Sequence, residues 1–142
     1  MPLRLISPVL RATHRIGLAL AGLREQRLSQ GEAYILALLA TKTPATIGEL
    51  HDGLAHKRST LTSILDRLAA AGLITRSVGV ADRRTFMVEL TAPGHRMAAR
   101  VLRRLANLEG RVESRVTAAD VAGFLKVVSA LDAEAASGTG AQ

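Results

Sequence analysis

The feature that most constrains this chain is a change in hydrophobic spacing at Leu73. Up to that residue, apolar side chains recur every three or four positions, which is typical of helices. Beyond it, Phe86, Val88 and Leu90 occupy alternate positions, which is typical of a strand. Gly72 stands at the change, where a helix often ends on a left-handed residue. We therefore expect a mainly α fold that contains a small β-hairpin.

Capping residues and spacing set the bounds of the expected elements. Before the hairpin we expect four helices. The first covers 3–24, the second starts at Ser29 or Gln30, the third follows the capping box Thr46–Glu49, and the fourth covers 57–71. We then expect strands at 74–78 and 85–90 around an exposed tip, helices opened by Thr91 and Thr117, and a frayed tail at 137–142.

Length and composition exclude several classes of protein. With 142 residues, 48% of them hydrophobic, the chain can bury the core of one domain. It has no cysteine, which excludes disulfides, thiolate zinc sites and thiol nucleophiles. Aromatic residues make up 2%, too few to stack the bases of a single strand. No apolar run approaches the length of a membrane span, so we expect a soluble cytoplasmic protein.

The positive charge is concentrated in one block. The formal net charge is +7, and residues 56–104 carry all of it, with ten basic side chains against three acidic ones. Such a block indicates a polyanionic partner, either a nucleic acid or an anionic membrane surface.

The order of elements narrows that choice. Two helices separated by a short turn, followed by a hairpin with a basic tip, form a winged helix-turn-helix. Such a domain places one helix in the major groove of double-stranded DNA and the hairpin at the minor groove. We expect residues 57–71 to be the recognition helix and residues 73–91 to be the wing. The candidate DNA-binding residues are Lys57, Arg58, Ser59, Thr60, Thr62, Ser63, Arg67, Arg83 and Arg84.

Five motifs in register resemble the MarR family of bacterial transcriptional regulators. They are Arg58-Ser59-Thr60-Leu61-Thr62, Leu65-Asp66-Arg67-Leu68, Gly72-Leu73-Ile74-Thr75-Arg76, Asp82-Arg83-Arg84 and Leu90-Thr91-Ala92-Pro93-Gly94. The close match covers about residues 28–97, and the flanking helices agree with the family in pattern.

The resemblance implies roles for three residues. It implies that Arg84 enters the minor groove, that Asp66 pairs with this wing arginine, and that Asp82 shapes the tip. It also implies a homodimer that acts on a pseudo-palindromic operator, as a repressor rather than an activator. In many members a small aromatic or phenolic effector releases the DNA, and His14 and Arg15 are the candidate effector-binding residues here.

The same resemblance divides the chain into four parts. They are an N-terminal dimerisation helix at 1–28, a DNA-binding lobe at 29–92, C-terminal dimerisation helices at 93–136 and a disordered tail at 137–142.

Three residue choices depart from the family pattern. Ser63 replaces a common arginine, so Arg58 or Arg67 has to supply any guanine contact. Lys57 stands where a capping serine or aspartate is usual, and offers a phosphate contact instead. The lack of cysteine excludes the branch of the family that senses peroxide through a thiol.

Simpler interpretations stay open for several of these features. The terminal helices could pack within one chain, the wing tip could be a solvated turn, and Asp66 could pair locally with Arg67 or Lys57. The basic side chains between 96 and 104 are read mainly as a solvated helix face, and His14 as an exposed residue of a dimer helix.

Other classes of function have less support from the sequence. The four histidines are scattered, so no metal site or cofactor is expected, and no catalytic cluster suggests an enzyme. The rival interpretations are a basic module for an anionic membrane surface or acidic partner, and an architectural DNA binder without sequence preference.

Overall fold

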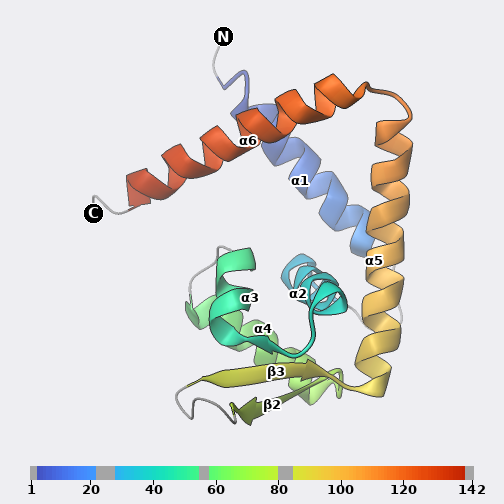
Figure 1. Ribbon diagram of the computed structural model, residues 1–142, viewed down its shortest axis with the longest axis vertical. Helices are drawn as coiled ribbons and strands as arrows, with labels where there is room; N and C mark the ends of the chain where they lie inside the picture. The colour runs from blue at the N-terminus through green and yellow to red at the C-terminus, as the bar shows by residue number, and fades with distance from the viewer. Residues whose placement is uncertain (1–2, 22–27, 55–57, 80–84, 140–142) are drawn as a thin grey trace. The chain divides into compact units, whose positions relative to one another are not determined.

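The computed structural model describes residues 3–21, 28–54, 58–79 and 85–139. Its elements, in order, are α1 (Ile6–Ala21), α2 (Gln30–Thr41), β1 (Ala45–Thr46), α3 (Ile47–Leu54), α4 (Arg58–Ala70), β2 (Ile74–Val78), β3 (Phe86–Leu90), α5 (Ala92–Glu113) and α6 (Ala118–Thr139). The mainly α fold with a small hairpin is confirmed (Figure 1).

The hairpin carries one more strand than the sequence predicts. β3 pairs antiparallel with β2 along its whole length, from Ile74 opposite Leu90 to Val78 opposite Phe86. The two-residue β1 adds to its other edge, with Ala45 opposite Val88. The sheet order is therefore β1-β3-β2, and β1 ties the turn before α3 to the wing.

Capping residues set the start of α2 and the end of α4, as the sequence predicts. Ser29 caps α2: its side chain accepts a hydrogen bond from the Glu32 amide, and Glu32 accepts one in return from the Ser29 amide. At the end of α4, Gly72 has a φ of 76°, and the Leu73 amide donates to the Leu68 carbonyl at 3.0 Å. This is a Schellman ending, which glycine forms without a Cβ penalty.

One core joins α2, α3, α4, the sheet and the start of α5. Figure 1 shows α2, α3 and α4 on the same side of the β2–β3 hairpin. The apolar side chains between them are almost fully buried: Ile35, Leu36, Leu39, Leu50, Leu61, Ile64, Leu65, Leu68, Leu73, Ile74, Val88, Leu90 and Met97.

The start of α5 is locked onto the turn after α4. The Thr91 hydroxyl accepts from the Gly94 amide at 3.0 Å and donates to the Gly72 carbonyl at 2.6 Å. A Cβ on Gly94 would lie 1.9 Å from the Leu73 carbonyl oxygen, so this contact requires glycine. Helix α4, the β2–β3 hairpin and α5 therefore meet at one backbone junction.

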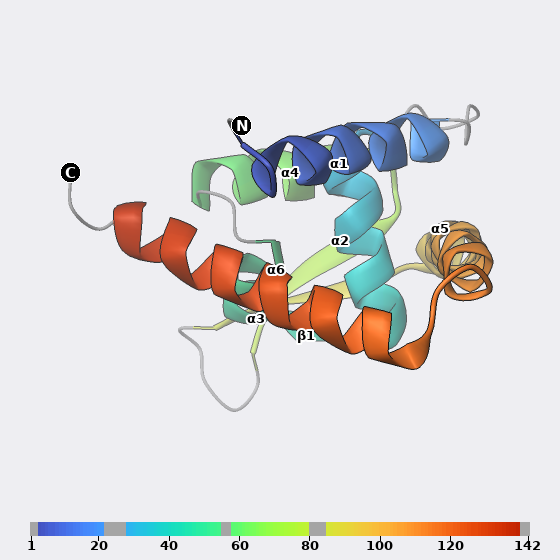
Figure 2. The same ribbon diagram turned by 90° about the horizontal axis from the view of Figure 1, so that it is seen from above.

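The chain divides into two compact units, residues 1–104 and residues 105–142. In the first unit α1 lies beside the start of α2, where the Gln30 side-chain amide donates to the Thr13 carbonyl (Figure 2). In the second unit Thr117 and Asp120 cap α6 reciprocally. No helix among the described residues is long and apolar enough to cross a membrane.

Several element bounds differ from those expected. α1 is described from Ile6 to Ala21 rather than over 3–24, and β3 begins at Phe86 rather than at Thr85. α6 continues to Thr139, so residues 137–139 are helical and do not belong to a frayed tail. The stretch before Gly138 is rich in alanine, which favours helix, and the helix continues through this glycine.

Candidate nucleic-acid interface

Helix α4 has an apolar face and a polar face. Leu61, Ile64, Leu65 and Leu68 recur at three- and four-residue intervals and anchor the helix in the core. The remaining side chains leave a polar face, of which Ser59, Thr60, Thr62, Ser63, Asp66 and Arg67 are all exposed. The short serines and threonines keep this face narrow enough for close approach to a groove about 12 Å wide.

One flank of this polar face is tied to the wing. The Arg76 side chain on β2 donates through Nη1 to Oδ1 of Asp66 at 2.7 Å, and both side chains are largely exposed. The sequence predicted a wing partner for Asp66 at Arg84, which lies outside the described residues. Among the described residues Asp66 pairs with Arg76, while its neighbour Arg67 pairs with Glu32.

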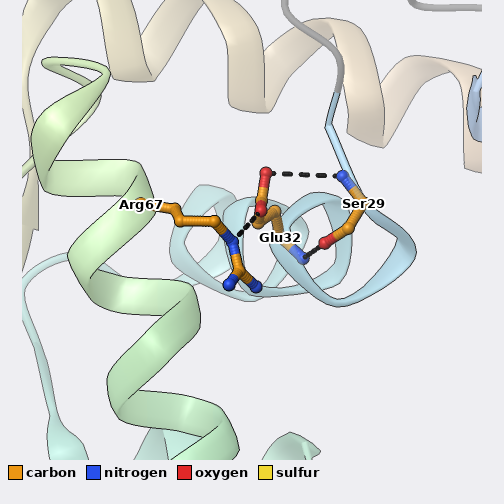
Figure 3. Close-up of polar contacts among 3 residues, drawn as sticks. All are labelled: Ser29, Glu32 and Arg67. Carbon is orange, nitrogen blue, oxygen red and sulfur yellow. Dashed lines mark hydrogen bonds and ion pairs between the residues drawn. The ribbon is translucent and has the colours of Figure 1, made fainter.

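The other flank is tied to the start of α2. Arg67 donates through Nε to Oε1 of Glu32 at 2.5 Å, while Oε2 of Glu32 accepts from the Ser29 amide (Figure 3). Glu32 is 7% exposed and is the one buried charged residue in the described part of the chain. A buried carboxylate requires a partner and hydrogen bonds, and Arg67 and Ser29 supply them.

The side chains of several predicted DNA-binding and wing residues are not described by the structure. Lys57, Asp82, Arg83 and Arg84 lie outside the described residues, and for Arg58 only the backbone at the start of α4 is described. The strands on either side of 80–84 are paired up to the Val78–Phe86 step.

A surface ion pair closes the turn between α2 and α3. Lys42 contacts the Glu49 carboxylate at 2.5 Å, and the Glu49 amide donates to the Thr46 hydroxyl, as the predicted capping box requires. The hydrogen bond from Lys42 lowers the pKa of Glu49 below its ordinary value of 4.5. This turn fixes α3 relative to α2 in the first half of the helix-turn-helix.

A cavity of about 390 Å³ opens beside α4. Its walls are mainly apolar, with polar groups from α4 and β2, and the lining residues are Ile47, Thr62, Leu65, Arg76, Ser77, Val78 and Phe86. The candidate effector residues, His14 and Arg15, are exposed on α1 and do not line it. No group of three or more potential metal ligands occurs among the described residues.

Sequence reasoning missed two side chains of this surface. Glu32 completes the pattern Ser29-x-x-Glu32, a capping box that can be recognised from the sequence. Arg76 belongs to a family motif, but nothing in its spacing marks it as the partner of Asp66. Each of the two residues forms an ion pair with a residue on another helix or strand, and periodicity along the sequence does not predict such pairs.

Comparisons with known proteins agree with this geometry. Residues 28–86 match the model of the MarR family. The comparison with curated proteins gave no match.

Solved structures resemble the chain over nearly its whole length. PcaV of Streptomyces coelicolor, a transcriptional regulator solved with its natural ligand, has a TM-score of 0.77 and 18% identity, covering 95% of this chain and 97% of that chain. BldR of Sulfolobus solfataricus, a transcriptional regulator, has a TM-score of 0.70 and 26% identity, covering 87% and 89%.

A third structure contains DNA. The transcriptional repressor CouR, bound to a 23-mer duplex, has a TM-score of 0.70 and 21% identity, covering 93% of this chain and 98% of that chain. At these identities the likeness lies in the winged-helix fold and in the helices that flank it.

Proposed function

The chain carries a MarR-family winged-helix domain at residues 28–86, and from that premise we propose that it is a sequence-specific DNA-binding regulator. MarR proteins are DNA-binding transcriptional regulators, the structural neighbours described above are transcriptional regulators, and one of them, CouR, was solved bound to a DNA duplex. The proposal for this chain is finer: a homodimeric repressor that acts on a pseudo-palindromic operator and is released by a small aromatic or phenolic effector.

The observation that carries the proposal is the outer face of α4. The helix is anchored by four buried side chains, and its described exposed face carries Ser59, Thr60, Thr62 and Ser63, followed by the two ion-paired residues Asp66 and Arg67. Hydroxyl groups donate to phosphates and base edges, and their small size lets the helix lie deep in the groove. The positive block at 56–104 supplies the attraction to phosphate.

The homodimer is supported by uncovered apolar side chains on the terminal helices. Leu10 and Leu18 on α1 are 63% and 60% exposed, and Phe124 and Leu125 on α6 are 59% and 57% exposed. Large apolar patches of this kind mark surfaces that a partner covers. A twofold dimer would present two α4 helices to half-sites about one helical turn apart, which a pseudo-palindromic operator matches.

The effector has two candidate locations in this chain. His14 and Arg15 on α1 offer cationic and hydrogen-bonding groups to an anionic ring compound. The cavity beside α4 offers apolar walls with Thr62 and Arg76, a combination that suits an aromatic acid. Release from DNA by a compound bound in this cavity follows directly, because Thr62 belongs to the recognition face.

Selection from a random pool of duplexes tests the proposed function. The full chain is incubated with the pool, bound duplexes are sequenced, and the recovered duplex is compared with a scrambled one by fluorescence anisotropy. We expect a twofold-symmetric consensus and at least about a thousandfold preference for it. Equal affinity for the scrambled duplex would support an architectural binder, and binding to anionic vesicles alone would support a membrane-surface module.

A further inference from the structure

Glu32 stands out because its carboxylate is buried, although burial of a charged group is unfavourable unless it is paired. It is 7% exposed, and its two oxygens have separate partners: Oε2 accepts from the Ser29 amide at 3.3 Å, and Oε1 accepts from Arg67 at 2.5 Å. Capping α2 would not require burial, since the exposed Glu49 forms a cap at α3. A further role for the buried charge is therefore expected on the side of Arg67.

Arg67 uses only part of its guanidinium in this contact. The ion pair joins Nε to Glu32, while the side chain as a whole is 55% exposed. Figure 3 shows both Nη atoms pointing away from the Glu32 carboxylate. An arginine that served only to neutralise a carboxylate would gain more from a two-bond fork, whereas here Nε bonds to Oε1 and the Ser29 amide, not a second arginine nitrogen, bonds to Oε2.

The position of Arg67 on α4 places those Nη groups at the edge of the recognition face. Ser59, Ser63 and Arg67 are spaced by four residues and form one ridge along the exposed side of the helix. The two serines allow close approach, and the long arginine at the end of the ridge reaches toward the wall of a groove. Guanidinium groups bind phosphates through two parallel N–H donors. The Nη groups of Arg67, which point away from Glu32, can supply these donors.

We propose that Glu32 is a positioning residue for DNA binding, which holds Arg67 so that its Nη groups meet a backbone phosphate beside the major groove. The inference rests on the proposed function and adds one residue that does not itself touch DNA. The long arginine side chain would otherwise lose rotamer freedom on binding, and the pair with Glu32 removes that freedom beforehand. Ser29 holds Glu32 in turn, so α2 fixes the aim of a side chain on α4.

The test is a mutant cycle on the full chain, with the duplex recovered by selection as the probe. Arg67→Ala is expected to weaken binding about tenfold and Glu32→Gln about fivefold, and the double variant is expected to resemble Arg67→Ala alone. The slope of log affinity against log salt should fall by about 0.9 in Arg67→Ala, because one phosphate contact is lost. It should also fall in Glu32→Gln, although that variant carries one more positive charge.

The salt slope separates this role from simple stabilisation of α2. Ser29→Ala is the matched control: it removes the side-chain half of the same cap, leaves the Glu32–Arg67 pair, and should lower thermal stability without changing the slope. If Glu32→Gln folds and binds as tightly as the wild type with an unchanged slope, Glu32 does not position Arg67. If it binds more tightly, Glu32 competes with phosphate, and the proposal is likewise overturned.

The cycle also distinguishes this inference from the proposed function. A wild-type chain that does not prefer the selected duplex to a scrambled one contradicts the proposed function itself. A wild-type chain that does prefer it, together with an Arg67→Ala variant of unchanged affinity and slope, contradicts only the role of Glu32 and Arg67. Should Arg67→Ala fail to fold because Glu32 is left unpaired, Glu32→Gln/Arg67→Ala carries neither charge and replaces it in the comparison.

Discussion

The winged-helix lobe at residues 29–92 and the terminal helices differ in how far they bury their own apolar side chains. In the lobe, Leu36, Leu39 and Leu65 are 0–2% exposed, and the core is closed by α2, α3, α4 and the sheet. On α6, Phe124 and Leu125 are more than half exposed. The lobe therefore buries its apolar side chains within one chain, whereas α6 leaves large apolar side chains exposed, which is the contrast that the proposed homodimer explains.

The largest effect is expected at the exposed apolar face of α6. Phe124→Glu places a charge where a dimer would bury an aromatic ring, and a twofold interface contains the change twice. Burial of such a side chain contributes about 1.5–3 kcal/mol, so the dimer should weaken by about 4 kcal/mol or roughly a thousandfold. Sedimentation velocity measures the change.

Ala133→Glu is the matched control for that variant. It adds the same charge on the side of α6 opposite Phe124 and should leave the mass in solution unchanged. A wild-type chain that sediments as a monomer would remove the contrast, because the apolar face would then be stable without a partner.

Two glycines, Gly94 where α5 packs on the lobe and Gly123 in α6, should respond to alanine with opposite signs. Gly94→Ala forces a Cβ against the Leu73 carbonyl at 1.9 Å and should lower the free energy of unfolding by about 3 kcal/mol. Gly123→Ala meets nothing within 4 Å and should raise it by up to about 1 kcal/mol, because alanine favours the helix. Urea denaturation followed by circular dichroism compares the two, and equal shifts would show that the junction at Thr91 is not rigid.

Substitutions in the wing should change DNA affinity without changing dimerisation. Arg84→Ala, at the wing tip outside the described residues, should cost about 1–3 kcal/mol of operator binding and leave the dimer intact. Arg115→Ala removes the same charge from an exposed position beyond α5 and should change affinity little. An Arg84→Ala variant that titrates the selected duplex like the wild type would contradict the assignment of the wing.

The smallest effect concerns a single carboxylate. The pKa of Glu49 is lowered by its hydrogen bond with Lys42, so the pair stabilises the fold above pH 4.5 and this contribution is lost as the pH falls through the lowered pKa. Lys42→Ala should raise the pKa of Glu49 toward 4.5 in an NMR titration. Asp120 on α6, whose pKa is lowered by the Thr117 amide, should be unaffected.

Sequence reasoning succeeded where a structural feature is encoded locally. The end of α4 follows from Gly72, and the start of α5 from Thr91, because each is a capping choice read within a few residues. β1 was missed because two residues carry no periodicity. The ion pair of Arg67 with Glu32 joins side chains 35 residues apart, and packing of α4 against α2, rather than spacing, brings them together.

The account's central claim is that two copies of this chain bind one duplex through paired recognition helices. Sedimentation equilibrium of the chain with the selected duplex, combined with hydroxyl-radical footprinting, measures the stoichiometry and the symmetry together. The account predicts two chains per duplex and two protected stretches about one helical turn apart. One chain per duplex, or protection that does not depend on the sequence, would contradict it.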